Sequence, residues 1–180
     1  MSASGTKGKR SELALAALSS GDDEQVMAAL ERIGAHGDAR AIGPLLRAWV
    51  ATGSEEVRTR IAGLLHQVKA ADSLGALMAA LNDHELIEAR DLVLGSIWSA
   101  GLDARDHLEK FVELGITGSD ATLFECLTIV ENQEVWPEKA ARAGHKRILK
   151  ALEDPLPAYR SALLGSMRDA LAERLGIETP

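Results

Sequence analysis

The stretch SEEVRTRIAGLL at residues 54–65 returns in altered form as LIEARDLVLGSI at residues 86–97. A shift of 32 residues aligns five positions of the two stretches: Glu56, Arg58, Ile61, Gly63 and Leu65 with Glu88, Arg90, Val93, Gly95 and Ile97. In both, the apolar residues recur at steps of three and four, which predicts a helix with one buried face. A period in the thirties with two helices per unit is typical of α-solenoids, in which each hairpin buries its apolar face against its neighbours.

The composition favours an all-α fold. The 180 residues are 46% hydrophobic but only 3% aromatic, and alanine and leucine, two strong helix formers, dominate. No strand-like alternation competes with the helical spacing, and short turns containing Gly, Asp or Ser separate the apolar segments. At one of these turns Ser54 precedes two glutamates, which predicts a capped helix start. We therefore expect a series of helices joined by short turns.

Taken in pairs, the helices predict four hairpins and a closing helix. The expected hairpins span residues 22–52, 54–81, 85–116 and 119–152, and the closing helix runs from about 156 to 175. The predicted organisation is a flexible tail at 1–10, a single helical-repeat domain at 11–176 that begins with a short helix, and a C-terminal tail at 177–180.

The pair EEVRTRIAGLL (55–65) and SLGALMAAL (73–81) resembles the HEAT-repeat family. The first helix carries a Val-Arg pair, the second carries spaced leucines, and Pro44 stands near a position where the family often has proline. The resemblance covers residues 22–116 and is weaker after Ser119, where no Val-Arg pair occurs. It implies an α-solenoid of stacked antiparallel hairpins. It also implies a scaffold that holds partners in a concave groove lined by the second helix of each hairpin.

The charge and the cysteine content restrict the class of protein. The net charge of -7 argues against a generic nucleic-acid binder, which usually carries excess lysine and arginine. Cys126 is the sole cysteine, so no intramolecular disulfide can form, and its apolar surroundings predict a buried residue. The apolar run at 13–18 is too short for a signal peptide or a transmembrane helix. We expect a cytoplasmic protein.

Motifs for catalysis and metal binding are missing from the sequence. HELIE at residues 84–88 has Glu88 where a zinc-protease helix needs its second histidine. The five histidines are scattered, and neither a Gly-x-Ser-x-Gly elbow nor a phosphate-binding glycine loop occurs. We therefore predict a protein that is not an enzyme and that needs neither a metal nor a cofactor.

Arginines and tryptophans recur on the predicted helices. Arg58 and Arg90 occupy equivalent positions, and we expect them to bridge repeats by pairing with Asp72 and Asp103, although a role in ligand binding is the alternative. The apolar surroundings of Trp49 and Trp98 predict core packing. Trp136 stands before a proline in a turn and is a candidate anchor for a partner, because tryptophan is enriched at interface hot spots.

The charges are unevenly distributed along the C-terminal half. Residues 103–134 carry a local charge of -6, whereas residues 135–152 carry +4. Lys139, Arg142, Lys146 and Lys150 follow one another at steps of three, four and four, so they form one stripe on a helix. The stripe is either a solvated face or an anchor for an acidic partner. The predicted partner-binding set also includes Trp136 and three acidic residues on the preceding predicted helix that would select charge: Asp106, Glu109 and Glu113. Arg40 and Arg47, one heptad apart on the polar face of an earlier predicted helix, would extend the groove contact.

These observations predict a non-catalytic scaffold or adaptor that binds another protein or peptide. One alternative is nucleic-acid binding through the basic helix at 139–150, which the acidic balance and the few aromatic residues disfavour. Another follows from the family resemblance alone, since bacterial HEAT-like repeats also occur in bilin-attachment lyases; this would give an enzyme-assisting role. Self-association is a further alternative, and no membrane partner is expected.

Overall fold

A computed structural model describes residues 11–36, 38–70 and 72–177 of the chain. All regular secondary structure in these residues is helical, which confirms the predicted all-α class. The chain divides into two compact units, Met1–Ala100 and Gly101–Pro180, and each is considered separately below. The tail predicted at 1–10 and the last three residues lie outside the described residues. The assignment of 11–176 to a single domain stays a prediction.

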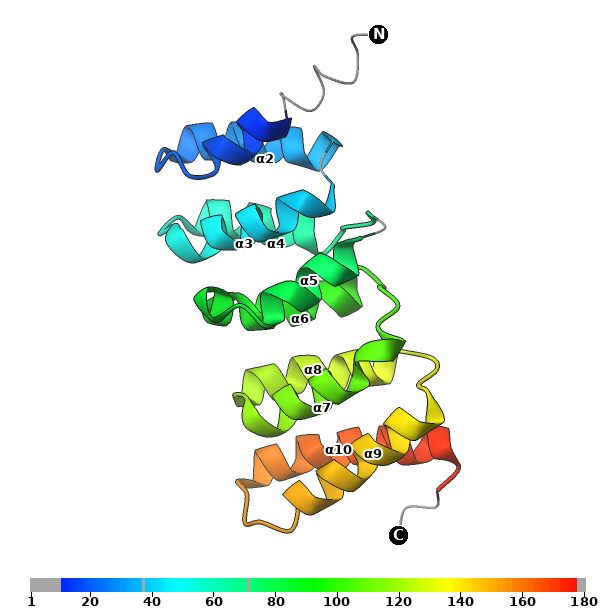
Figure 1. Cartoon of the computed structure of the whole chain (residues 1–180). Helices are drawn as coiled ribbons and strands as arrows, with labels where there is room; N and C mark the ends of the chain where they lie inside the picture. The colour runs from blue at the N-terminus through cyan, green and yellow to red at the C-terminus, as the bar shows by residue number, and fades with distance from the viewer. Residues whose placement is uncertain (1–10, 37, 71, 178–180) are drawn as a thin grey trace, which may run out of the picture. The chain divides into compact units, whose positions relative to one another are not determined.

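The described part of the first unit starts with a helical stretch at residues 11–17. The later helices of this unit are, in order, α2 (Asp23–His36), η1 (Ala39–Ala41), α3 (Ile42–Ala51), α4 (Glu55–Leu65), α5 (Ser73–Leu81), η2 (His84–Ala89) and α6 (Arg90–Ser99). Helix α4 packs against both α2 and α6, and α3 packs against α5 (Figure 1). The helices of this unit thus alternate between two layers. Their apolar faces enclose fully buried side chains such as Leu30, Leu46, Ile61, Leu77 and Ile97.

The second unit contains η3 (Arg105–His107), α7 (Leu108–Thr117), α8 (Asp120–Asn132), α9 (Glu138–Ala151) and α10 (Ala158–Leu175). Helix α7 contacts α8 and α9, and α10 contacts the same two helices (Figure 1). This arrangement surrounds a core of side chains that are almost wholly inaccessible to solvent, among them Phe111, Leu123, Cys126, Ile148 and Met167. The burial of Cys126 and the closing helix expected near 156–175 are confirmed.

Two turns share the sequence Thr-Gly-Ser followed by an acidic residue, at 52–55 and 117–120. Each joins two helices that pack together, α3 to α4 and α7 to α8. In both, the serine accepts a hydrogen bond from an amide three residues later, at 3.4 Å for Ser54 and 3.0 Å for Ser119. These bonds satisfy amides that the helix start would otherwise leave unpaired, as predicted for Ser54.

The helix pairs that pack closely are shifted by one helix along the chain from the hairpins expected from the sequence. Consecutive helices that contact each other closely are α3 with α4, α5 with α6, α7 with α8 and α9 with α10. The expected pairs α2 with α3 and α4 with α5 make fewer contacts. In the first unit, the connection between α3 and α4 at 52–54 is shorter than the one between α4 and α5 at 66–72, which lets the former pair lie closer.

The two related stretches at residues 54–65 and 86–97 also differ in their local backbone structure. The sequence predicts one helix from Glu85, but residues 84–89 form the 3₁₀ helix η2, and the α-helix begins at Arg90. Leu86 has φ -105° and ψ 16°, outside the helical region, and this residue marks the kink. Arg58 therefore lies inside α4 whereas Arg90 is the first residue of α6, so the two arginines are not structurally equivalent.

Candidate functional site

Helix α9 exposes its charges on one side and buries small and apolar residues on the other. Ala141, Gly144 and Ile148 are buried. A Cβ atom at Gly144 would lie 3.2 Å from Val112 and 3.3 Å from Leu171, so the glycine permits close approach to α7 and α10. Glu138 in the first turn and Lys150 in the last turn of α9 interact favourably with the helix dipole.

Three lysines form a line opposite this buried face. Lys139, Lys146 and Lys150 are exposed. An α-helix has 3.6 residues per turn, so Lys146 and Lys150, seven and eleven residues after Lys139, point within about 20° of the Lys139 direction around the helix axis. The buried Ile148 points about 180° away from that direction. In the described residues, none of these lysines forms an ion pair, so their positive charges face solvent without a partner.

Arg142, the fourth member of the predicted stripe, is already neutralised. Its guanidinium pairs with Glu138 one turn earlier, with 2.8 Å between nitrogen and oxygen. On the flank of α9, Arg147 pairs with Glu109 of α7 at 3.6 Å. The available positive charge of α9 therefore comes from the three lysines, which from here on are called the lysine line.

The acidic residues predicted to select charge lie beside this helix. Because α7 packs against α9, Glu109 and Glu113 stand on the neighbouring helix, and both are exposed. Glu113 pairs with Lys110 at 3.8 Å, and Asp106 is exposed in η3 just before α7. Of the three acidic residues, Glu109 is thus in contact with the basic helix through Arg147, whereas Glu113 pairs within α7.

Trp136 is a core residue, and its prediction as a partner anchor is wrong. Only 6% of its surface is exposed, and its indole Nε1 donates a hydrogen bond to the Val130 carbonyl at 3.2 Å. Its ring meets Phe111 edge to face, with centroids 6.4 Å apart. The proline after Trp136 indicates a turn in the sequence, but the inward direction of the side chain depends on packing between α7 and α8.

The other two tryptophans also depart from prediction in part. Trp49 is half-buried, and the Arg58 guanidinium lies 4.9 Å from the centre of its ring, which is a cation–π contact. Trp98, expected in the core, is 37% exposed. Arg58 therefore packs on an aromatic ring within the first unit.

One of the two predicted arginine bridges between repeats does not form. Among the described residues, no ion pair joins Arg58 to Asp72. Arg90 and Asp103 lie in different units, so a bridge between them stays a prediction. The Arg58 Nε is buried without a hydrogen-bond partner. Asp103 pairs with Arg105 at 2.7 Å, and this hydrogen bonding and charge hold the pKa of Asp103 below its usual value.

Arg40 and Arg47 are engaged within the first unit. Arg40 lies in η1, not in the same helix as Arg47, and pairs with Asp38 at 2.7 Å. The Arg40 side chain thereby lowers the pKa of Asp38. Arg47 on α3 pairs with Asp83 at 3.6 Å. The predicted extension of a groove through these two arginines therefore uses cations that already have acidic partners.

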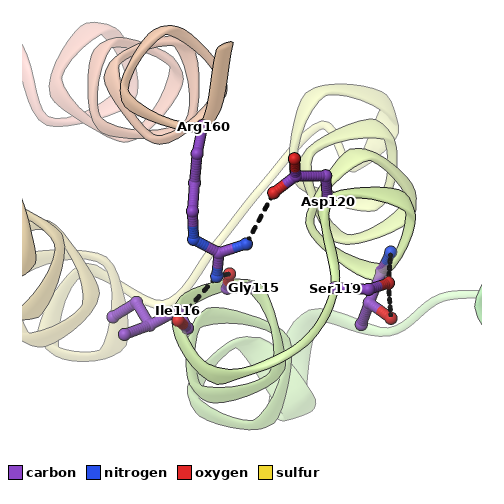
Figure 2. Close-up of polar contacts among 6 residues, drawn as sticks. Gly115, Ile116, Ser119, Asp120 and Arg160 are labelled. Carbon is purple, nitrogen blue, oxygen red and sulfur yellow. Dashed lines mark hydrogen bonds and ion pairs between the residues drawn. The ribbon is translucent and has the colours of Figure 1, made fainter. Parts of the chain in front are cut away.

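Arg160 joins three helices of the second unit, a role that the sequence analysis missed. Figure 2 shows its guanidinium between α10, the C-terminal end of α7 and the start of α8. It donates to the carbonyls of Gly115 at 3.0 Å and Ile116 at 2.7 Å, and it pairs with Asp120 at 2.9 Å. The positive charge also faces the negative end of the α7 dipole.

Arg174 joins the other end of α10 to the end of α8. It donates to the carbonyls of Glu131 at 2.8 Å and Gln133 at 3.0 Å, where α8 ends. No sequence signal identifies either arginine, because their acceptors are mostly backbone carbonyls. The two arginines fix α10 to the ends of the preceding hairpin.

Two open grooves lie within the units. One, of about 480 Å³, runs between α2 and α4 and is lined by Met27, Glu55, Glu56, Thr59, Arg60 and Gly63. The other, of about 660 Å³, lies between α8 and α10 and is lined mainly by polar residues: Glu131, Ser166, Asp169, Ala170, Glu173, Arg174 and Ile177. Across the part of the chain that the structure describes, no three His, Cys, Asp or Glu residues gather as metal ligands. No described helix has the length and apolar character to cross a bilayer.

Comparison with known proteins adds no family or relative to this geometry. No protein-family model, curated protein or solved structure matches the chain.

Proposed function

We propose that this protein is a non-catalytic scaffold of the HEAT-like solenoid type, which holds a partner protein at the exposed face of α9. The observation that carries the proposal is the lysine line. Lys139, Lys146 and Lys150 point away from the core, and none is neutralised by a described acidic side chain. Three aligned, unpaired cations on a rigid helix offer charge complementarity to an acidic partner.

The packing inside each unit supports the solenoid part of the proposal. In the first unit, α2, α4 and α6 follow one another in one layer while α3 packs on α5 in the other. In the second unit, α7 packs on α9 and α8 packs on α10. These contacts within each unit are those expected if antiparallel helix pairs stack as they do in helical-repeat proteins.

The fixation of α10 supports the binding role of α9. Arg160 and Arg174 tie α10 to the ends of α7 and α8, and α9 packs against both α7 and α10. The lysine line is thereby carried by a helix with neighbours on two sides. A binding surface on such a preorganised element loses less entropy on association than one on a loop.

The test is affinity capture of partner proteins from source-cell lysate with the full chain and the variant Lys139→Glu, Lys146→Glu, Lys150→Glu. A matched control, Lys7→Glu, Lys9→Glu, Arg10→Glu, changes the net charge by the same amount at residues outside the described structure. We expect a stoichiometric protein partner to be captured by the wild type and the control and to be lost by the lysine variant. Equal capture of that partner by all three proteins would contradict the proposal.

A further inference from the structure

We infer that the α9 face binds a short acidic peptide segment that carries an apolar side chain. This inference rests on the proposed function and specifies the chemistry of the partner. Its first support is the length of the lysine line. Lys139 and Lys150 are eleven positions apart, which at 1.5 Å per residue is about 16 Å. About five residues of an extended chain, or about eleven residues of a helix, cover that distance.

Acidic residues limit the positive surface at both ends of α9. Before the line stand Glu134 and Glu138, and after it stand Glu153 and Asp154; all four are exposed. Arg142 offsets Glu138, but the other three form no ion pair within the described residues. Between these ends, an anion meets the three lysines as the unpaired cations of α9, because Arg142 and Arg147 already pair with Glu138 and Glu109. A longer polyanion that runs on along the helix axis meets like charge at each end.

This limit favours a peptide over a nucleic acid. A nucleic acid presents phosphates continuously, and proteins that bind it use positive surface that follows the backbone, commonly with aromatic rings for base stacking. Helix α9 has no Phe, Tyr or Trp. Two of its five cations, Arg142 and Arg147, already pair with Glu138 and Glu109, which leaves three unpaired lysines. A short run of Asp or Glu side chains matches both features, because its charge ends where the lysine line ends.

An exposed apolar side chain beside the lysine line indicates the second requirement for the partner. Leu149 is 42% exposed, three residues after Lys146 and adjacent to Lys150 in the sequence. Its direction on the helix lies about 80° from the Lys139 direction, so it flanks the line. Val135, 57% exposed, adds apolar surface just before α9. A leucine or aromatic residue among the partner's acidic residues would cover Leu149 and lose its own contact with water.

The test is a binding titration by fluorescence anisotropy at low salt with the full chain. The probes are a labelled twelve-residue peptide of glutamate and leucine, the same peptide with glutamine for glutamate, and a labelled twenty-nucleotide oligothymidine. The proteins are wild type, the variant Lys139→Gln, Lys146→Gln, Lys150→Gln, the single variant Leu149→Ser, and the control Lys7→Gln, Lys9→Gln, Arg10→Gln. Circular dichroism melting of each protein verifies that it is folded.

We expect the acidic peptide to bind the wild type and the control more tightly than the glutamine peptide or the oligonucleotide. Replacing the three lysines should weaken binding by about tenfold, because three exposed ion pairs are lost. Leu149→Ser should weaken it by about threefold through lost apolar contact. Tighter binding of the oligonucleotide, or peptide binding that the lysine variant retains, would overturn the inference.

The capture and titration experiments together distinguish a failure of this inference from a failure of the proposed function. If the captured partner depends on the three lysines but the acidic peptide does not bind, the proposed scaffold stands and this partner chemistry is wrong. If the captured partner does not depend on the lysines, the proposed function itself fails.

Discussion

At the scale of single residues, two tryptophans have environments opposite to those that the sequence predicts. Trp136, in the connection before α9, is 6% exposed, whereas Trp98, near the end of α6, is 37% exposed. Trp136 is held by a hydrogen bond from its indole to Val130 and by its edge-to-face contact with Phe111. A buried tryptophan with both kinds of contact contributes to stability, so its effect should appear in unfolding measurements.

We expect Trp136→Ala to lower the free energy of unfolding by about 3–5 kcal/mol, because it leaves a large cavity in the core of the second unit. Trp136→Phe keeps most of the apolar volume but loses the indole hydrogen bond to Val130, so its cost should be smaller. Urea denaturation followed by far-ultraviolet circular dichroism measures both. If Trp136→Ala cost no more than a surface substitution, the burial of this side chain would be refuted.

The carboxyl group of Asp38 should titrate below its usual pKa of 3.8, chiefly because the Arg40 side chain donates hydrogen bonds to it. Since the pKa is lowered by folding, the stabilisation from this pair is present above pH 3.8 and is lost as the pH falls through the folded pKa. Carbon-detected NMR titration measures the value directly. The variant Arg40→Gln should move it back toward 3.8; an unchanged value would remove Arg40 as the cause.

At the scale of helices and turns, similar sequences tolerate different substitutions. The turns at 52–55 and 117–120 share Thr-Gly-Ser and the serine cap. A Cβ at Gly53 would meet nothing within 4 Å, whereas one at Gly118 would lie 2.6 Å from the Leu114 carbonyl and 2.7 Å from Thr122. The two glycines also hold different positions, since Gly118 is the C-cap of α7, whereas Thr52 is the C-cap of α3 and Gly53 follows it.

Gly118→Ala should therefore lower the free energy of unfolding by about 1–3 kcal/mol, since the backbone must shift to admit the new methyl group. Gly53→Ala is the matched control. It should be neutral, or stabilise the protein by less than about 1 kcal/mol, because alanine lowers the conformational entropy of the unfolded chain. Thermal and urea unfolding of the two variants measure the contrast. Equal effects would show that the tight packing around Gly118 has no energetic consequence.

Arg160 offers a second test at this scale, because it connects α10 to the end of α7 and the start of α8 (Figure 2). Arg160→Met should destabilise the protein by about 2 kcal/mol, since it leaves two part-buried carbonyls without their charged donor. Asp120→Asn removes the ion pair with this arginine and a negative charge from the first turn of α8 but leaves both carbonyl bonds, so it should cost about 1 kcal/mol or less. An Asp120 variant as unstable as the Arg160 variant would assign the effect to the ion pair instead of the carbonyls.

At the scale of the whole molecule, each compact unit has an enclosed core of its own. Phe111, Leu123, Ile148 and Met167 fill the core of the second unit, and Leu30, Ile61 and Leu77 belong to the first. In each unit, helices in contact have their apolar faces turned inward. Such cores give each unit the means to fold by itself.

We expect a fragment of residues 101–180 to be helical and to unfold cooperatively, because its four long helices pack around one core. Circular dichroism and differential scanning calorimetry measure this. Trp136→Ala in the same fragment is the control, since it should lower the melting temperature. A fragment with helical signal but no cooperative transition would show that the second unit lacks an independent core.

By itself the sequence determined the features that depend on neighbouring residues along the chain. Steps of three and four between apolar residues predicted the helices, Ser54 marked a helix start, and the spacing of Lys139, Lys146 and Lys150 placed them on one face. These are local properties, since helix geometry alone relates residues a few positions apart.

The pairing of helices, the burial of one tryptophan and the neutralisation of particular charges depend on contacts between distant parts of the chain. The pairing of α3 with α4, the burial of Trp136 and the bonds from Arg160 to Gly115 and Ile116 join groups that turns bring together. Helical periodicity identifies a buried face but not the neighbour that covers it. Every residue has a backbone carbonyl, so residue type does not indicate which carbonyl an arginine will bond to. That partner is known only from the folded structure.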